Sequence, residues 1–222
     1  MELCGVWEMI MDSKRNIVAF NTFYTIILSI IIALIFGKSL GDVSSWLFVI
    51  PKVITVQLIS ILLFNKYFWK CKIFRKWLVA FPDMSGTWIG LLKSNYINPK
   101  TKKRVDPIPC MLVIKHKFKK ININFYSGES ISYSFSEELN FDSNRHLKRL
   151  SYSYTNEPST LLDYRSTSHK GTTILNLVND NELIGYYYTD RTTKGEMSFN
   201  FHSKEFLDKI PTELPKHPLQ TQ

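Results

Sequence analysis

The segment from Gly185 to Gly195 holds the side chains of this 222-residue chain that are best suited to bind a ligand. It combines three tyrosines, an arginine and three threonines between two glycines. Arg191 offers a planar fork of N–H donors that matches phosphate oxygens. Threonine hydroxyls add hydrogen bonds, and tyrosine faces stack on nucleobases for about 1–3 kcal/mol per base. We therefore predict a nucleotide-like ligand here. The competing interpretation is an ordinary strand, turn and strand with an exposed arginine and core tyrosines.

Catalytic chemistry has no comparable support. The chain contains no P-loop, no GxGxxG before a helix, no HExxH and no GxSxG. Glu137 and Glu138 are adjacent, so in a strand they point to opposite faces and cannot easily pair across a substrate. The five histidines lack metal-ligand spacing: His116, His146, His169, His202 and His217. We predict no enzymatic activity, no catalytic residue and no metal site.

Composition also limits the partners and the compartment. Residues 81–222 carry nineteen Lys and Arg against fifteen Asp and Glu, so this part of the chain is only mildly basic. A broad DNA- or RNA-binding face would need a stronger basic excess. The cysteines, Cys4, Cys71 and Cys110, are far apart and lack metal-ligand spacing. We expect free thiols in a reducing cytoplasm.

The ligand-binding segment belongs to a series of short alternating strands. Residues 121–125, for example, alternate between apolar side chains and asparagines. We predict eight strands, at about residues 86–94, 109–117, 119–127, 129–137, 147–156, 171–179, 182–189 and 195–202. The connections are short, which favours an antiparallel meander. Eight such strands can close into a lipocalin-like β-barrel with room for one small ligand.

Two long apolar runs precede the strands. They extend from Ile17 to Phe36 and from Val43 to Phe64, and each meets the length of roughly 20 residues that a bilayer-spanning helix needs. The predicted fold is therefore a membrane α-helical hairpin plus an all-β domain. We expect residues 1–80 to form the hairpin and a basic juxtamembrane segment, residues 81–209 the barrel, and residues 210–222 an irregular tail.

The charges around the runs predict their orientation. Five cations and no acid follow the second run: Lys66, Lys70, Lys72, Arg75 and Lys76. The turn between the runs carries one lysine and one aspartate. By the positive-inside rule, both termini and the β domain lie in the cytoplasm. Trp46 is expected at the outer membrane interface, and Tyr67, Trp69 and Trp77 at the inner one.

Lys52 is unusual because it lies, next to Pro51, inside the second apolar run. A lysine in a membrane span is costly unless its ammonium reaches the interface or lines a polar path. Lys52 lies nine residues from Val43, at the non-cytoplasmic end of the second run, so both interpretations stay open.

The order of these parts, with the motifs Ser85–Gly90 and Gly185–Gly195, resembles a known family. The family is the two-transmembrane β-barrel effectors of bacterial CBASS anti-phage systems, the CD-NTase-associated membrane β-barrel proteins. The resemblance covers nearly the whole chain. The architecture is the stronger part of it, because each motif alone is weak.

The resemblance implies a function. A nucleotidyltransferase from the same operon makes a cyclic dinucleotide, the barrel binds it, and the protein oligomerises and disrupts the bacterial inner membrane in abortive infection. The cyclic dinucleotide is the activating ligand, and no other cofactor is implied. Trp88 and Gly90 would form a first-strand structural signature. The predicted ligand contacts are Tyr187, Arg191, Thr193, Trp88 and Tyr188.

Two other functions remain open from the residues themselves. One is a membrane-anchored, lipocalin-like binder of a lipid or another apolar molecule. The other is a scaffold whose hairpin only tethers an interaction domain. Pocket polarity separates the first alternative from a nucleotide receptor, since a lipid pocket should be almost wholly apolar.

Overall fold

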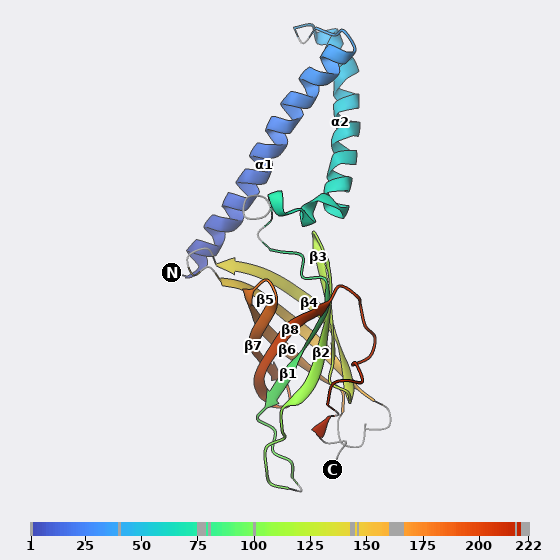
Figure 1. The fold of residues 1–222 in the computed structure, drawn as a ribbon. Coiled ribbons are helices and arrows are strands. Elements are labelled where there is room, and N and C mark those ends of the chain that lie inside the picture. Colours follow the sequence, from blue (N-terminus) through green and yellow to red (C-terminus); the bar gives the residue numbers. More distant parts are fainter. Residues whose placement is uncertain are drawn as a thin grey trace. The chain divides into compact units, whose positions relative to one another are not determined.

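The chain divides into two compact units, Met1–Pro82 with Lys117–Lys119, and Asp83–His116 with Lys120–Gln222. The computed structural model describes residues 2–39, 41–74, 79, 81–99, 101–142, 145, 147–159, 167–215 and 217–218, with side chains from residue 16 onward. The first unit contains the helices and the second contains the strands (Figure 1).

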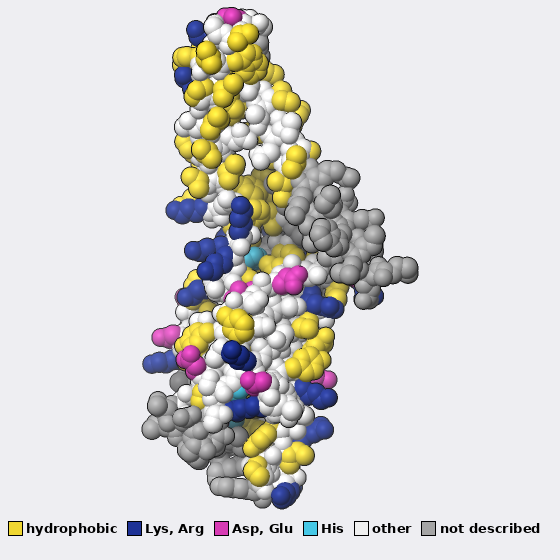
Figure 2. Space-filling model, turned by 180° about the vertical axis from the view of Figure 1, so that it is seen from behind, with side chains coloured by type: hydrophobic (Ala, Val, Ile, Leu, Met, Phe, Trp, Pro, Cys, Tyr) yellow, Lys and Arg dark blue, Asp and Glu magenta, His cyan; other side chains and the backbone are white. Residues whose placement is uncertain are grey.

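Both predicted helices of the first unit are confirmed. They are α1, Glu2–Ile35, and α2, Val43–Lys66. The spans Asn16–Ile35 and Val43–Lys66 are long and apolar enough to cross a membrane, and hydrophobic side chains cover their surface (Figure 2). Helix α1 begins well before its apolar run. Polar residues do not end a helix by themselves, so the sequence pattern marks the membrane-length part and not the helix start.

Helices α1 and α2 pack against each other near the turn that joins them. Ile32 and Ala33 of α1 are buried against Val49 and Val53 of α2. Asp42 is the N-cap of α2, and its carboxylate accepts a hydrogen bond from the Ser44 backbone N–H at 3.3 Å.

The side chain of Lys52 extends toward this turn. Its Nζ lies 3.3 Å from the centre of the Phe48 ring and 3.5 Å from the Phe48 carbonyl oxygen. The centre of the Phe36 ring lies 5.4 Å from the same atom. This is the direction expected for a lysine that reaches an interface, and its role in the membrane stays a prediction.

Two short 3₁₀ helices follow, η1 at Phe68–Lys70 and η2 at Lys72–Phe74. Trp69 of η1 is buried in a small apolar cluster with Val79 and Phe64. The exposed Tyr67 precedes it, and Trp46 near the start of α2 is also partly exposed. Residues 75–78 and 80 of the predicted juxtamembrane segment, which include Arg75, Lys76 and Trp77, lie outside the described residues.

The second unit is the predicted eight-stranded antiparallel barrel. Its strands are β1 Gly86–Ser94, β2 Ile108–Lys117, β3 Lys120–Tyr126, β4 Ser130–Asp142, β5 Leu147–Pro158, β6 His169–Asn179, β7 Glu182–Thr189 and β8 Lys194–Ser203. Each strand pairs with the next, and β8 pairs with β1 to close the barrel. The connections β1–β2, β3–β4, β5–β6 and β7–β8 therefore share one end. The opposite end receives the chain at Asp83 and releases it after Ser203 (Figure 1).

Large apolar side chains fill the barrel near the end where the chain enters, which we call the closed end. The Trp88 ring lies edge to face with Phe201, with 5.3 Å between ring centres. Trp88 Nε1 donates to the Met84 carbonyl oxygen at 3.1 Å, so the indole is both buried and hydrogen-bonded. Other fully buried side chains of the barrel are Leu112, Ile114, Leu150, Leu175, Leu183 and Phe199.

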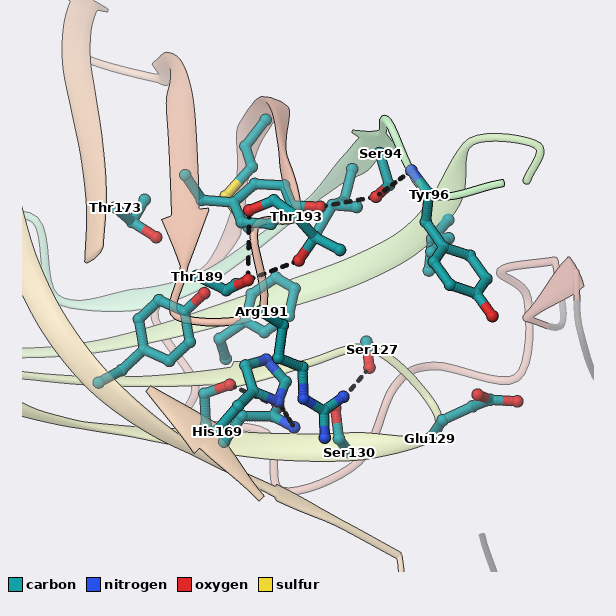
Figure 3. Close-up of a pocket in the computed structure, with 18 of the residues that line it drawn as sticks. Ser94, Tyr96, Ser127, Glu129, Ser130, His169, Thr173, Thr189, Arg191 and Thr193 are labelled. Atoms are coloured by element: carbon teal, nitrogen blue, oxygen red, sulfur yellow. Dashed lines mark hydrogen bonds between the residues drawn. The ribbon is translucent and has the colours of Figure 1, made fainter. Parts of the chain in front are cut away.

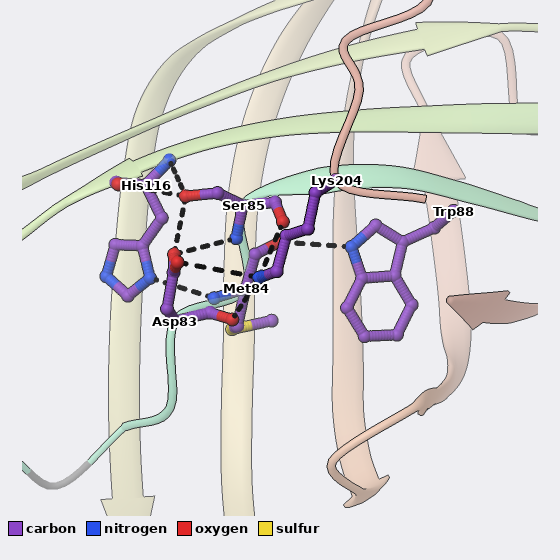
Figure 4. A network of polar contacts seen from close by, with 6 residues as sticks. All are labelled: Asp83, Met84, Ser85, Trp88, His116 and Lys204. Carbon is purple, nitrogen blue, oxygen red and sulfur yellow. Dashed lines mark hydrogen bonds and ion pairs between the residues drawn. The ribbon is translucent and has the colours of Figure 1, made fainter. Parts of the chain in front are cut away.

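A polar network joins the entering chain to β2 and to the residue after β8 (Figure 4). The Asp83 carboxylate accepts from the Ser85 backbone N–H at 3.0 Å and lies 3.5 Å from Lys204 Nζ. Ser85 Oγ bonds to the His116 carbonyl oxygen at 3.0 Å, and the Met84 N–H donates to His116 Nδ1 at 3.3 Å. The network fixes where the barrel begins.

The motif Ser85–Gly90 is explained by this end of the barrel. Gly86 has φ +133°, and an added Cβ would lie 2.3 Å from the Ser203 carbonyl oxygen. Thr87 is fully buried, and its hydroxyl donates to the Glu205 carbonyl oxygen and accepts from the Leu207 N–H. These residues hold β8 and the start of the tail against β1.

The C-terminal tail runs from the end of β8 along the outside of the barrel to its other end (Figure 1). Lys115 Nζ of β2 lies 5.7 Å from the centre of the Phe206 ring. Gly128 in the β3–β4 connection lies beside Ile210 and His217. The tail thus links the two ends of the barrel.

Candidate ligand-binding site

A cavity of about 240 Å³ opens at the end of the barrel that carries the β1–β2, β3–β4, β5–β6 and β7–β8 connections. We call this end the mouth (Figure 3). Its lining mixes aromatic rings, hydroxyls and charged groups. The polar and aromatic lining residues are Ser94, Tyr96, Phe125, Ser127, Glu129, Ser130, Ser132, Tyr152, Tyr154, Asn156, His169, Thr173, Tyr187, Thr189, Arg191, Thr193 and His217.

In β5 and β6 the inward side chains become more polar toward the mouth. In β5 they are Leu150, Tyr152, Tyr154 and Asn156, and all four are buried. In β6 the sequence runs from Leu175 through Thr173 to His169. Because side chains alternate along a strand, every second residue adds one level to the same interior. The floor of the cavity is therefore aromatic and its rim is polar.

Three buried tyrosines, Tyr152, Tyr154 and Tyr187, contribute to the aromatic part of the lining. The rings of Tyr152 and Tyr154 are tilted, with 5.9 Å between their centres. Tyr187 Oη donates to Ser94 Oγ at 2.9 Å. Burial raises the pKa of all three phenols, so they are neutral at physiological pH. Neutral phenols present ring faces for stacking and hydroxyls for hydrogen bonds.

Gly171 of β6 makes room for one of these rings. An added Cβ at Gly171 would lie 2.4 Å from Tyr154 Oη, so a larger residue there would displace the phenol. Nearby, Thr173 Oγ1 is buried and has no hydrogen-bond partner among the described residues. A buried hydroxyl of this kind gains a bond when a polar ligand enters the cavity.

Arg191 lies in the β7–β8 connection at the mouth. Its guanidinium donates to both the backbone carbonyl oxygen and the hydroxyl of Thr167. Asp190 does not pair with it. Instead, the Asp190 carboxylate accepts from the Lys170 backbone N–H at 3.0 Å, and this contact ties the β7–β8 connection to β6.

His169 lies next to Arg191 on this wall of the cavity (Figure 3). Its Nδ1 is 3.3 Å from the Thr167 carbonyl oxygen and 3.4 Å from Asn156 Nδ2. Burial, and to a smaller extent the charge of Arg191, lower the pKa of His169, while the contact with Thr167 partly offsets them. A ligand phosphate placed between these two side chains would favour the protonated imidazole.

The turn after β7 is organised by threonines. The Thr189 N–H donates to the Thr193 carbonyl oxygen at 2.9 Å, and their two hydroxyls lie 2.6 Å apart. Thr192 adopts a left-handed conformation with φ 63°. The turn places Thr189, Arg191 and Thr193 together on the cavity lining.

Glu129 brings negative charge to the cavity lining. It lies apart from Arg191 in the view of Figure 3. One carboxylate oxygen of Glu129 is 3.3 Å from Nδ1 of His217, which the C-terminal tail supplies, and both side chains are buried. Positive and negative groups are thus separated around the rim. Among the described residues, no group of three or more His, Cys, Asp or Glu side chains is arranged to hold a metal ion.

The structure brings three of the five predicted ligand contacts together. Tyr187, Arg191 and Thr193 line the cavity. Trp88 is buried at the closed end, and Tyr188 is half exposed beside Tyr186 on the outer face of β7. Neither lines the cavity, and direct ligand contact stays a prediction for all five.

Tyr152 and Tyr154 lie outside the two motifs of the sequence analysis, and from the sequence they could be considered only as part of an alternative pocket with Tyr133. Tyr133 is exposed, whereas the other two lie in the cavity. Their spacing of two residues in a strand was the available signal, because it puts both on one face. His169 and Glu129 had no such signal, since only the barrel register brings them to the mouth.

Residues 79–200 match the protein family described as Cap15, cyclic dinucleotide receptor domain. The chain belongs to this Cap15 family. The match includes the barrel strands almost to the end of β8. CD-NTase-associated protein 15 of Staphylococcus schleiferi is similar to this chain, with 24% identity over 186 residues. That alignment covers 84% of this chain and 96% of the relative, so the likeness to a Cap15 protein extends beyond the receptor domain.

Proposed function

We propose that the barrel binds a cyclic dinucleotide at its mouth, with a phosphate at Arg191 and a base against the tyrosines. The observation that carries this proposal is the presence of a guanidinium, a set of hydroxyls and three buried tyrosines in one cavity. Guanidinium and hydroxyl groups suit phosphate, and aromatic faces suit bases. Membership of the Cap15 receptor family supports the same ligand class.

The size of the cavity suggests how such a ligand sits. Its volume of about 240 Å³ is slightly below the range of about 300–1,000 Å³ for small-molecule sites. We infer that one base and its phosphate enter the cavity. The other half of the ring then lies at the rim, where Tyr96 and Thr193 line the opening. A lipid or another apolar ligand is disfavoured, because its chain would bury charged and hydroxyl groups without partners.

In this proposal the helical hairpin is the part of the protein that disrupts the membrane. Helices α1 and α2 span the bacterial inner membrane, and both termini and the barrel lie in the cytoplasm. Support comes from the two apolar spans and from the lysines at and after the end of α2: Lys66, Lys70 and Lys72. The ligand, made by a nucleotidyltransferase of the same operon, drives oligomerisation, and the assembled hairpins disrupt the membrane. This requires the ligand to bind the assembled state more tightly than the free one. No other cofactor is needed.

Thermal-shift measurements on the full-length protein in detergent test the binding step. A panel of cyclic dinucleotides should contain at least one that raises the melting temperature, because a ligand at 100 times its Kd stabilises by about 2.7 kcal/mol. In the same assay, Arg149→Ala is the matched control for Arg191→Ala. Arg149 is on β5, next to the inward Leu150, and is not part of the cavity lining. No shift with any member of the panel would contradict the proposal.

Membrane disruption is tested in cells that make both the protein and its ligand. A membrane-impermeant dye should enter cells that carry the full-length chain and the synthase, but not cells that carry residues 81–222 with the same synthase. Dye uptake caused by the shortened chain, or none from the full-length pair under verified ligand production, would contradict the effector function.

A further inference from the structure

Polar side chains gather between the two apolar helices, away from their packed turn. Asn21, Thr22 and Thr25 of α1 and Gln57 of α2 line a cavity of about 360 Å³. We call this cavity the polar groove. Asn21 and Gln57 each lie fourteen residues from the turn-proximal end of their helix, which is about 21 Å at 1.5 Å per residue. Both amides are thus at the same depth, inside the membrane-length spans.

The threonine hydroxyls of the polar groove form hydrogen bonds within their own helix, but the side-chain amides do not. Thr22 Oγ1 donates to the Val18 carbonyl oxygen at 2.9 Å, and Thr25 Oγ1 donates to that of Asn21 at 2.7 Å. Among the described residues, the side-chain amides of Asn21 and Gln57 have no hydrogen-bond partner. In hydrocarbon such groups have no water to bond, so leaving them unpaired is unfavourable.

The two helices do not close the polar groove by themselves. Their buried contacts involve Ile32, Ala33, Val49 and Val53, all near the turn. Beyond that region, one side-chain hydrogen bond joins the described parts of the helices, between Tyr24 Oη and Ser60 Oγ at 2.7 Å. The space beside Asn21 and Gln57 is therefore open to another membrane helix.

We propose that the polar groove is the surface by which the hairpin of a second copy of this chain docks in the bilayer. An amide is both donor and acceptor, so Asn21 and Gln57 can pair with the same residues of another copy. Lipid chains offer neither group. Polar side chains and close packing are what associate helices in a membrane. The inference rests on the membrane insertion in the proposed function, and it does not depend on which ligand the barrel binds.

Disulfide crosslinking in membranes tests the groove. In a chain whose native cysteines are replaced (Cys4→Ser, Cys71→Ser and Cys110→Ser), Thr22→Cys puts a thiol in the groove and leaves both amides in place. Phe23→Cys is the control, because Phe23 lies at nearly the same depth, is 65% exposed and does not line the groove. Disulfide dimer formation is measured over time during oxidation with a membrane-permeant catalyst, both with and without synthesis of the ligand. Thr22→Cys should form the disulfide dimer several-fold faster than Phe23→Cys in at least one of these states.

A second pair of variants tests the amides directly. Adding Asn21→Leu and Gln57→Leu to Thr22→Cys should lower the dimer yield about threefold to thirtyfold, which corresponds to the strength of polar contacts between membrane helices. The variant chain must still fractionate with the membrane. Equal crosslinking from Phe23→Cys, or an unchanged yield after the leucine substitutions, would overturn the inference. Failure of ligand binding in the thermal-shift experiment would contradict the proposed receptor function and leave this result intact.

Discussion

The closed end and the mouth of the barrel are built from the same strands but have opposite character. At the closed end, Trp88 and Phe199 are buried and fill the interior. At the mouth, Asn156 and His169 occupy inward positions of the strands and line a cavity. Whether an inward residue fills the interior or lines the cavity therefore depends on its position between the two ends of its strand.

Polar contacts at the two ends differ as well. At the closed end, Ser85 and Thr87 bond mainly to backbone atoms and so hold segments of chain together. At the mouth, Tyr187 bonds to Ser94, and Thr189 to Thr193, through side chains that also line the cavity. Substitutions at the closed end should therefore change stability, and substitutions at the mouth should change binding.

The largest effect is expected for Trp88→Ala. Removing a buried tryptophan leaves a cavity and should lower the free energy of unfolding by about 3–5 kcal/mol, as measured by chemical denaturation of the full chain in detergent. The Kd of the fraction that remains folded should stay unchanged. Trp88→Phe is the milder variant in case the alanine variant does not fold. A large loss of affinity with little loss of stability would instead place Trp88 in the binding site.

Arg191→Ala should show the reverse pattern. Loss of a hydrogen bond to a charged group should weaken cyclic dinucleotide binding by about 1.5–3 kcal/mol, as measured by calorimetry. Stability should change much less, because Arg191 bonds only to Thr167 among the described residues. Arg149→Ala should bind normally. If Arg191→Ala unfolds the protein, Arg191 has a structural role; if the variant binds as tightly as the original chain, the phosphate lies elsewhere.

Tyr187→Phe removes one hydroxyl from the mouth and keeps the ring. The bond from Tyr187 Oη to Ser94 Oγ is lost, so we expect a decrease in stability or in affinity of about 0.5–1.5 kcal/mol. Tyr186→Phe is the control, since Tyr186 lies on the outer face of β7. Equal effects from the two variants would show that the position in the cavity has no special role.

The smallest effect concerns pH and His169. In the folded protein without ligand, the pKa of His169 lies below its ordinary value of 6.5. The unfolded state therefore binds the proton more readily. Its contribution to stability is present above pH 6.5 and is lost as the pH falls. A phosphate beside the imidazole would reverse this preference, so affinity should rise as the pH falls below about 6.5, by less than about 1 kcal/mol. His169→Gln should remove that part of the pH dependence in a binding titration. An identical pH profile in the variant would contradict the assignment.

The fold was largely predictable because alternation and apolar length are local signals. The strands begin and end within about two residues of the predicted positions, except that β4 continues to Asp142 instead of ending near residue 137. A β-bulge between Ser134 and Ser136 shifts the register with β5 there. The bulge changes which residues face inward, so the alternation in the sequence breaks while the strand goes on.

The site was predictable only in part, for a related reason. Tyr187, Arg191 and Thr193 are close in sequence, and one hairpin brings them together. Tyr188 alternates with Tyr187 and so faces outward. Trp88 faces inward but at the closed end. Height along the barrel depends on the register of all eight strands, which no single segment encodes.

The even number of strands has an evolutionary consequence. Because the chain enters at Asp83 and leaves after Ser203 at the same end, all four connections at the mouth are hairpin loops with both ends anchored in the barrel. Such loops tolerate insertions and substitutions better than the strands that hold them. The lengths of these loops can change without moving the closed end, where the chain enters the barrel from the helices. One scaffold can therefore acquire new ligand preferences while its connection to helices α1 and α2 stays the same.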